Sequence, residues 1–132
     1  MKMLDVCAAV LFQDGRVFLA TRRPGSHLEG KWEFPGGKIE QGESPAQCIL
    51  RELKEELFWS VGNPRELFRM VHSYPDRSVR LHFLLCDPCE GSTPSPREGQ
   101  QCGWFTPEEA AALDLAPADR AALARIREFP GA

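Results

Sequence analysis

The segment 35–57 restricts most strongly how this chain of 132 residues can fold. It opens with the turn sequence Pro-Gly-Gly at 35–37, and Ser44 follows as a helix cap, with proline next and glutamine three residues on. This capping pattern predicts a helix from Pro45 to Leu57. At 100° per residue one face of the helix is apolar, formed by Ala46, Ile49, Leu50, Leu53 and Leu57. The helix must therefore pack on a neighbouring layer of structure.

Strand patterns lie on both sides of this helix. Apolar and β-branched residues from Leu4 to Gln13 and from Arg16 to Thr21 surround the dipeptide Asp14-Gly15, which predicts an antiparallel hairpin. Further strands are expected at Lys31 to Phe34, Leu67 to Tyr74 and Val79 to Cys86, and a last short strand ends with Trp104 and Phe105. One helix is expected to open at Thr106, and another to span Ala118 to Phe129. Strands and helices alternate irregularly, which predicts an α/β fold with a mixed sheet and helices on both faces. The length predicts a single domain, 1–132.

Charge and hydropathy exclude two classes of partner. The net charge of −3 and the lack of a basic stripe argue against binding nucleic acid through its phosphates. The longest apolar runs are far shorter than the ~20 residues of a membrane helix, and no leader opens the chain. We expect a cytoplasmic protein without membrane or nucleic-acid partners. We expect a monomer, with an oligomer as the alternative.

The five cysteines are expected to be reduced thiols. Their odd number and the lack of a secretory signal argue against a disulfide framework. Cys86 and Cys89 form a C-x-x-C pair, but a structural zinc ion needs four ligands, and only Cys102 follows. We interpret the pair as a strand end that runs into a proline turn.

Three carboxylates cluster on the predicted helix. Glu52, Glu55 and Glu56 are spaced i, i+3 and i+4, so they share a face beside the apolar stripe and repel one another. One explanation is a solvated face with Arg51 and Lys54 as counter-charges. The other is an oxygen-ligand site for Mg²⁺ or Mn²⁺.

The spacing around these carboxylates favours the metal site. Gly37 is followed by five positions, Glu43, seven positions and the run Arg51-Glu52-Leu53-Lys54-Glu55-Glu56. This pattern resembles the Nudix box of hydrolases that act on nucleoside diphosphate-linked compounds, and at a given position it arises by chance on the order of once in 10⁷. Glycine before the helix lets the backbone approach a diphosphate closely. The resemblance implies the Nudix α/β/α sandwich.

One position departs from the family pattern. The Nudix box has glycine two residues after its second paired glutamate, where this chain has Phe58. That glycine is suited to a left-handed residue that ends the helix. We therefore expect the helix to continue by a turn or to end without a left-handed cap, with Gly62 as the next break.

Motifs outside the box resemble the MutT-like group of the family. They include Thr21-Arg22-Arg23, 27–29, 31–40, 74–77, Glu98-Gly99-Gln100 and 115–119. The resemblance implies hydrolysis of oxidised purine nucleoside triphosphates, chiefly 8-oxo-dGTP, to monophosphate and pyrophosphate. One alternative is hydrolysis of CTP or of modified pyrimidine triphosphates. A second is a non-catalytic module that binds a nucleotide, and it is less favoured because such modules typically lose box carboxylates that this chain retains.

The resemblance also assigns site residues. The metal-binding and catalytic set comprises the Gly36 carbonyl, Glu52, Glu55, Glu56 and Glu98. The substrate-binding set comprises Arg23, His27, Glu33, Phe34, Pro35 and Asp119. Glu52 is the first choice for general base, and Arg51 is expected to pair with Glu43. An ionised Asp119 would accept both adjacent donors of guanine, its N1–H and exocyclic amine.

Overall fold

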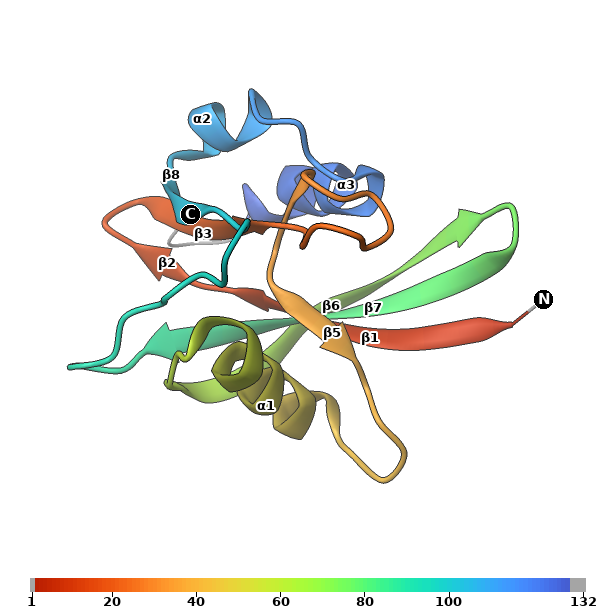
Figure 1. The fold of residues 1–132 in the computed structure, drawn as a ribbon, viewed down its shortest axis with the longest axis horizontal. Coiled ribbons are helices and arrows are strands. Elements are labelled where there is room, and N and C mark those ends of the chain that lie inside the picture. The colour runs from red at the N-terminus through yellow and green to blue at the C-terminus, as the bar shows by residue number, and fades with distance from the viewer. Residues whose placement is uncertain (1, 129–132) are drawn as a thin grey trace. The chain divides into compact units, whose positions relative to one another are not determined.

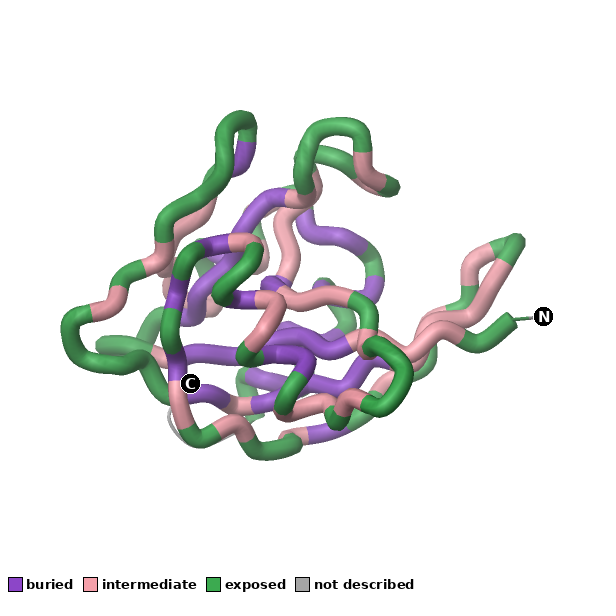
Figure 2. The backbone as a smooth tube through the Cα atoms, turned by 60° about the horizontal axis from the view of Figure 1, so that its bottom comes forward, coloured by how far each residue is buried: buried purple, intermediate pink, exposed green. Residues whose placement is uncertain are grey.

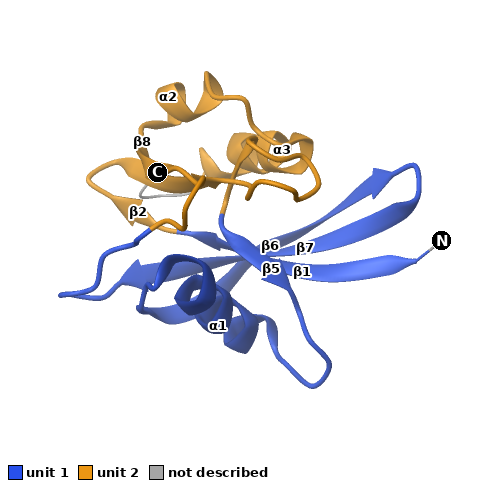
Figure 3. Cartoon of the chain, viewed as in Figure 1, with its two compact units in different colours: residues 1–10, 35–95 blue, residues 11–34, 96–132 orange. Residues whose placement is uncertain are grey.

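The computed structural model describes residues 2–128, which form two compact units (Figure 3). The first unit comprises residues 1–10 and 35–95, and the second comprises residues 11–34 and 96–132. Each unit is therefore assembled from two separate stretches of the sequence.

The first unit is a four-stranded sheet with one helix (Figure 1). The strand order is β5-β1-β7-β6, and the bounds are β1 Met3–Val10, β5 Gly36–Lys38, β6 Val61–Tyr74, β7 Arg77–Pro88 and α1 Pro45–Leu57. Strands β1 and β7 are parallel, whereas β1–β5 and β6–β7 are antiparallel. The predicted mixed sheet in an α/β fold is thus confirmed.

Helix α1 begins as the sequence predicts. Ser44 Oγ accepts the Gln47 N–H at 3.1 Å, and Gln47 Oε1 accepts the Ser44 N–H at 2.9 Å. The buried side chains are Cys48, Ile49, Leu53 and Leu57. Figure 2 shows how buried and exposed stretches alternate along the backbone. The prediction that Leu50 is buried is wrong, because the face that packs is rotated toward Cys48 and leaves Leu50 37% exposed. Within residues 2–128 no helix is long and apolar enough to cross a membrane.

Both expectations for the end of this helix are wrong. The helix ends at Leu57, and Phe58 takes the left-handed conformation, with φ 51° and ψ 37°. The Phe58 N–H donates to Lys54 O at 3.0 Å, which is the single hydrogen bond of the αL capping motif. The Trp59 N–H donates to Leu53 O at 3.2 Å. Trp59 is 1% exposed and Phe58 is 64% exposed. The burial of Trp59 therefore turns the chain at this point, and Phe58 adopts the conformation that the turn needs.

The second unit contains a smaller antiparallel sheet and two helices. Strands β2 Phe12–Gln13, β4 Trp32–Glu33 and β8 Cys102–Phe105 each pair with β3 Arg16–Thr21, and the helices are α2 Pro107–Ala111 and α3 Pro117–Ile126. Asp14 and Gly15 have φ of 52° and 74°, which confirms the predicted hairpin turn. Phe129, the last residue of the predicted final helix, lies outside the described residues.

Two strand predictions need correction. The stretch Leu4 to Gln13 is not one strand, because β1 ends at Val10 and pairs with β7, whereas β2 belongs to the sheet of the second unit. Strand β6 begins at Val61, six residues before the predicted Leu67. Register shifts between Gly62 and Arg65 accommodate the intervening proline, which cannot donate to the ladder.

Candidate active site

Glu52 is an enclosed carboxylate of the helix face. Its side chain is 14% exposed, whereas that of Glu55 is 58% exposed. A Cβ placed on Gly37 would lie 2.4 Å from Glu52 Cδ, so the carboxylate packs directly on the glycine backbone. Burial raises the pKa of Glu52, and the charges of Glu56 and Glu55 add to this rise, although Arg51 opposes it.

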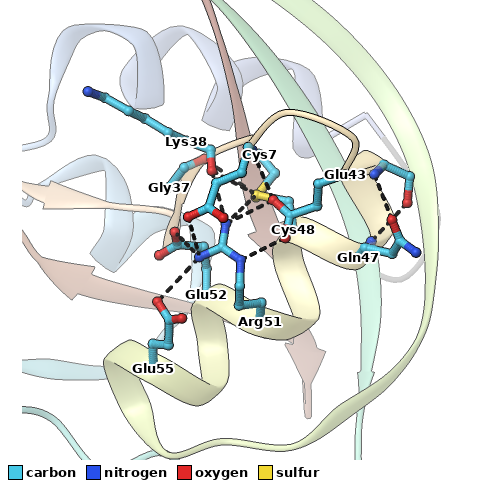
Figure 4. Close-up of polar contacts among 11 residues, drawn as sticks. Cys7, Gly37, Lys38, Glu43, Gln47, Cys48, Arg51, Glu52 and Glu55 are labelled. Atoms are coloured by element: carbon cyan, nitrogen blue, oxygen red, sulfur yellow. Dashed lines mark hydrogen bonds and ion pairs between the residues drawn. A yellow bond between two sulfur atoms is a disulfide. The ribbon is translucent and has the colours of Figure 1, made fainter.

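Arg51 organises the acidic groups around it (Figure 4). Its Nε and Nη2 donate to the two Glu43 oxygens at 2.7 and 2.9 Å, which confirms the predicted pair. Its Nη1 donates to Glu52 Oε1 at 2.9 Å and to Glu55 Oε2 at 3.3 Å, and Nη2 donates to Lys38 O at 3.1 Å. The hydrogen bonds from Arg51 lower the pKa of Glu43 to about 2. One guanidinium therefore joins the glycine strand to the carboxylate helix.

Strand β5 requires glycine at Gly36 for a steric reason. Gly36 pairs with Ala8 of β1, and a Cβ on Gly36 would lie 1.9 Å from the Cys7 carbonyl oxygen. No other residue fits there without displacing the backbone. The Gly36 backbone is consequently fixed by β1.

The chemistry of the helix carboxylates suits a divalent cation. The donors are all oxygens, which hard ions such as Mg²⁺ and Mn²⁺ prefer. Burial and the neighbouring carboxylates raise the pKa of Glu52, and a cation beside the group would favour its ionised form. No three His, Cys, Asp or Glu side chains in the part of the chain that the structure describes converge as a preformed metal site. Arg51 instead holds Glu52 and Glu55.

Asp119 is the buried acidic group of the second unit. The start of α3 is tied to β4, because the Ala116 N–H donates to Trp32 O at 2.9 Å. Asp119, in the first turn of α3, is 5% exposed, and its Oδ1 accepts the Phe34 N–H at 2.9 Å. Sequence positions 34 and 119 are thus brought into direct contact.

The ionised state expected for Asp119 is disfavoured by its surroundings. Burial raises the pKa of Asp119 well above its ordinary value of 3.8, and the negative charge of Glu33 raises it further. The Phe34 N–H and Arg22 act in the opposite direction. Below this raised pKa the side chain is a neutral acid that can donate one hydrogen bond and accept another.

The other predicted substrate residues have diverse settings. Glu33 is paired with Arg22 at 2.8 Å, and Arg22 Nε also donates to the His27 carbonyl. Arg23 and His27 are exposed on the loop 22–30. Arg22, which the sequence analysis did not assign, thus contacts two predicted substrate residues, and its sequence signal is its place in the motif Thr21-Arg22-Arg23.

Pro35 and Glu98 complete the predicted set. Pro35 belongs to the first unit, and its carbonyl accepts the Ala9 N–H at 2.7 Å. Glu98 belongs to the second unit, where it is exposed on a turn. Its assignment to the carboxylate set stays a prediction. The nearby Gln100, which the sequence analysis did not assign, is buried and donates from Nε2 to Thr21 O at 3.0 Å.

The expectation of reduced thiols is wrong for one pair of cysteines. Cys7 of β1 and Cys48 of α1 form a disulfide, while Cys86, Cys89 and Cys102 are free. The odd cysteine count could not reveal this pair, because only the packing of α1 on the sheet brings together residues 41 positions apart.

The mixed sheet, the glycine strand and the carboxylate helix together define a Nudix-type fold. The solved structure of the ORF135 protein of Escherichia coli is similar, with a TM-score of 0.76 and 37% identity over 96% of this chain and 90% of that one. The NUDIX domain family matches residues 6–125. The chain therefore belongs to the Nudix hydrolase family.

Two relatives from Escherichia coli K12 align with nearly the whole chain. An 8-oxo-dGTP diphosphatase is 33% identical over 98% of this chain and 100% of its own length. A CTP pyrophosphohydrolase is 39% identical over 90% of this chain and 87% of its own length. These relatives act on different bases, so the base-contacting residues bear on the choice of substrate.

Proposed function

We propose that this protein is a nucleoside triphosphate pyrophosphohydrolase that depends on Mg²⁺ or Mn²⁺ and whose preferred substrate is 8-oxo-dGTP. The observation that carries the proposal is Glu52, an enclosed carboxylate with a raised pKa that packs on the glycine strand beside two further glutamates. The relative named as an 8-oxo-dGTP diphosphatase supports the substrate. The family match runs through both units, which supports a single catalytic domain, 1–132. We further propose a cytoplasmic monomer.

The residues of the chain divide the work of phosphate cleavage. Glu52, Glu55, Glu56, Glu98 and the Gly36 carbonyl are the proposed ligands of the cation. A divalent cation supplies neutralisation of phosphate charge and acidification of water. Glu52 accepts a proton from the attacking water, since a raised pKa makes a carboxylate a stronger base. Arg51 orients Glu52 through its 2.9 Å hydrogen bond.

The nucleoside and phosphate contacts are proposed for the remaining predicted residues. They are Arg23, His27, Glu33, Phe34, Pro35 and Asp119. Asp119 is the proposed reader of the base edge. As a carboxylate it would accept the N1–H and exocyclic amine of guanine, and as a neutral acid it would accept the N1–H and donate to O6. Either form therefore matches 8-oxoguanine.

Hydrolysis of CTP is the second candidate, and the burial of Asp119 favours it. Cytosine presents an exocyclic amine donor beside the acceptor N3, so a carboxylate would repel N3, whereas a neutral acid donates to it. The rise in the pKa of Asp119 favours this neutral form. The relative named as a CTP pyrophosphohydrolase supports the same candidate.

The first test addresses the carboxylate face. Glu56→Gln is expected to lower kcat by at least ~10²-fold, because one charge is lost from the proposed cation shell. Glu90→Gln is the matched control, since Glu90 is an exposed glutamate of the same unit. Full activity of Glu56→Gln, or of the wild type in excess EDTA, would show that the proposed metal-dependent mechanism is wrong, and a wild type that hydrolyses no nucleoside triphosphate would show that the hydrolase proposal is wrong.

The second test separates the two substrates. The value of kcat/KM is measured for 8-oxo-dGTP, dGTP and CTP with the wild type and with Asp119→Ala. The variant is expected to raise KM for 8-oxo-dGTP by ~10- to 100-fold and to retain hydrolysis, because two hydrogen bonds to the base are lost and the helix is unchanged. A wild type that prefers CTP selects the second candidate. Equal losses on all three substrates would show that Asp119 does not read the base.

A further inference from the structure

Cys7 and Cys48 form a buried pair beside the candidate active site. Cys7 is 2% exposed and Cys48 is 0% exposed. Their Cα atoms are 6.6 Å apart, within the range that a disulfide spans without backbone movement. The folded chain therefore holds the two sulfurs ready to bond.

The pair lies where the glycine strand meets the carboxylate helix (Figure 4). Cys7 is opposite Gly37 in the β1–β5 ladder. Cys48 Sγ lies 3.7 Å from the Gly37 carbonyl oxygen and 3.4 Å from that of Lys38. A bond between the sulfurs thus joins β1 to α1 next to the backbone on which Glu52 packs.

The surroundings of Cys48 distinguish it from the free cysteines Cys86 and Cys102. Cys48 Sγ is bonded to Cys7 Sγ and lies 3.9 Å from Arg51 Nη2. By contrast, burial raises the pKa of Cys86 to about 12, and burial also raises the pKa of Cys102. The Cys7 and Cys48 sulfurs are partners in the fold, whereas Cys86 and Cys102 are free, so the intramolecular disulfide forms at the Cys7–Cys48 pair.

We propose that Cys7 and Cys48 are a two-electron oxidation site for small peroxides and that its disulfide clamps the glycine strand to the carboxylate helix. The Cys48 sulfur attacks a peroxide oxygen, and the O–O bond breaks to give a sulfenic acid and one water (or alcohol). The Cys7 sulfur then attacks the Cys48 sulfur, the S–O bond breaks and a second water leaves. Two thiols are thereby oxidised to a disulfide and one peroxide is reduced.

Burial decides which reagents reach the pair. A small peroxide can enter during local opening, whereas a thiol of the size of glutathione needs a larger opening. In a reducing compartment such a pair is reduced at rest and closes when oxidant is present. The disulfide closes a long loop, because its cysteines are 41 positions apart, so the oxidised protein is more stable than the reduced one.

The test uses the full-length chain carrying Cys89→Ser and Cys102→Ser, which leave the pair and the buried Cys86. The reduced protein is treated with hydrogen peroxide and then denatured with an alkylating agent. We expect a mass loss of two hydrogens, a cross-link between tryptic peptides 3–16 and 39–51, and a Tm higher by roughly 5–15 °C. Added Cys48→Ala should abolish all three changes, and Cys7→Ala provides an independent second check.

Three results would overturn the proposal. The first is a peroxide-treated protein that keeps all its thiols. The second is oxygen addition at Cys7 or Cys48 without a cross-link. The third is a cross-linked protein whose Tm equals that of the reduced protein. None of these measurements depends on hydrolase activity, so the oxidation site and the proposed function can fail independently.

Discussion

Replacing Asp119 by asparagine or by alanine separates its hydrogen bonding from its charge. Asparagine keeps an acceptor for the Phe34 N–H but cannot titrate, whereas alanine removes both properties. Phe34 is 2% exposed, so its N–H has no ready access to water once the acceptor is lost. Comparison of the two variants therefore isolates the 2.9 Å hydrogen bond that ties α3 to β4.

The magnitude follows from this burial. A buried donor left without an acceptor costs about 1–3 kcal/mol, and this is the expected gap in free energy of unfolding between Asp119→Ala and Asp119→Asn. At a urea dependence of about 1–3 kcal/mol per molar, the gap corresponds to a midpoint difference of roughly 1 M. Urea unfolding followed by tryptophan fluorescence measures it. Equal midpoints for the two variants would refute the reasoning.

The sign of the pH dependence follows from the raised pKa of Asp119. The folded state holds the proton more tightly than the unfolded state, whose pKa is near 3.8. The resulting stabilisation is fully present below pH 3.8 and is lost as the pH rises toward the folded-state pKa. The wild type is therefore expected to lose stability relative to Asp119→Asn over this window. Parallel pH profiles of the two proteins would show that Asp119 titrates normally.

Three further substitutions test the site and its supports. Gly37→Ala is expected to lower kcat by at least ~10-fold with little change in Tm, because the new methyl group displaces the flexible Glu52 carboxylate. An unchanged kcat would contradict this prediction. Phe58→Gly is expected to stabilise the protein by about 1 kcal/mol, measured by calorimetry, because glycine adopts a φ of 51° without strain; a lower Tm would mean that packing of the ring outweighs the strain. Glu43→Gln should lower the urea midpoint of unfolding at pH 7. The difference in midpoint from the wild type should shrink as the pH falls from 4.5 toward 2, because Glu43, with its lowered pKa, stabilises the fold only while it is ionised. A difference independent of pH would contradict that prediction.

Features coded by neighbouring residues could be predicted from the sequence. The capping box at Ser44 and the turn at Asp14-Gly15 depend on interactions within a few residues, and both are confirmed. The pairing of Arg51 with Glu43 is confirmed as well, because the spacing of the Nudix box carries it. The second sheet was not predicted, since the break between β1 and β2 has no glycine or proline to mark it.

Features set by distant contacts could not be predicted from local patterns. The left-handed Phe58 follows from the burial of Trp59, which a helix pattern does not contain. The disulfide needs the packing of α1 on β1. The pKa of Asp119 depends on Phe34 and Glu33, which lie more than 80 positions earlier in the sequence. A carboxylate at a helix start looks solvated in the sequence, and only the fold shows that it is enclosed.

The parallel pairing of β1 with β7 has a consequence for biosynthesis. Met3 is paired with Ser78 and Val10 with Leu85, so β1 leaves the ribosome before this partner, which is made 75 residues later. Strand β5, which pairs with the other edge of β1, is made sooner. At about 5–20 residues per second, translation leaves the β7 edge of β1 unpaired for about 4–15 s. The segment Cys7–Leu11, wholly buried in the folded protein, is exposed on the nascent chain during this interval. It is where a chaperone that captures short apolar stretches is expected to bind first.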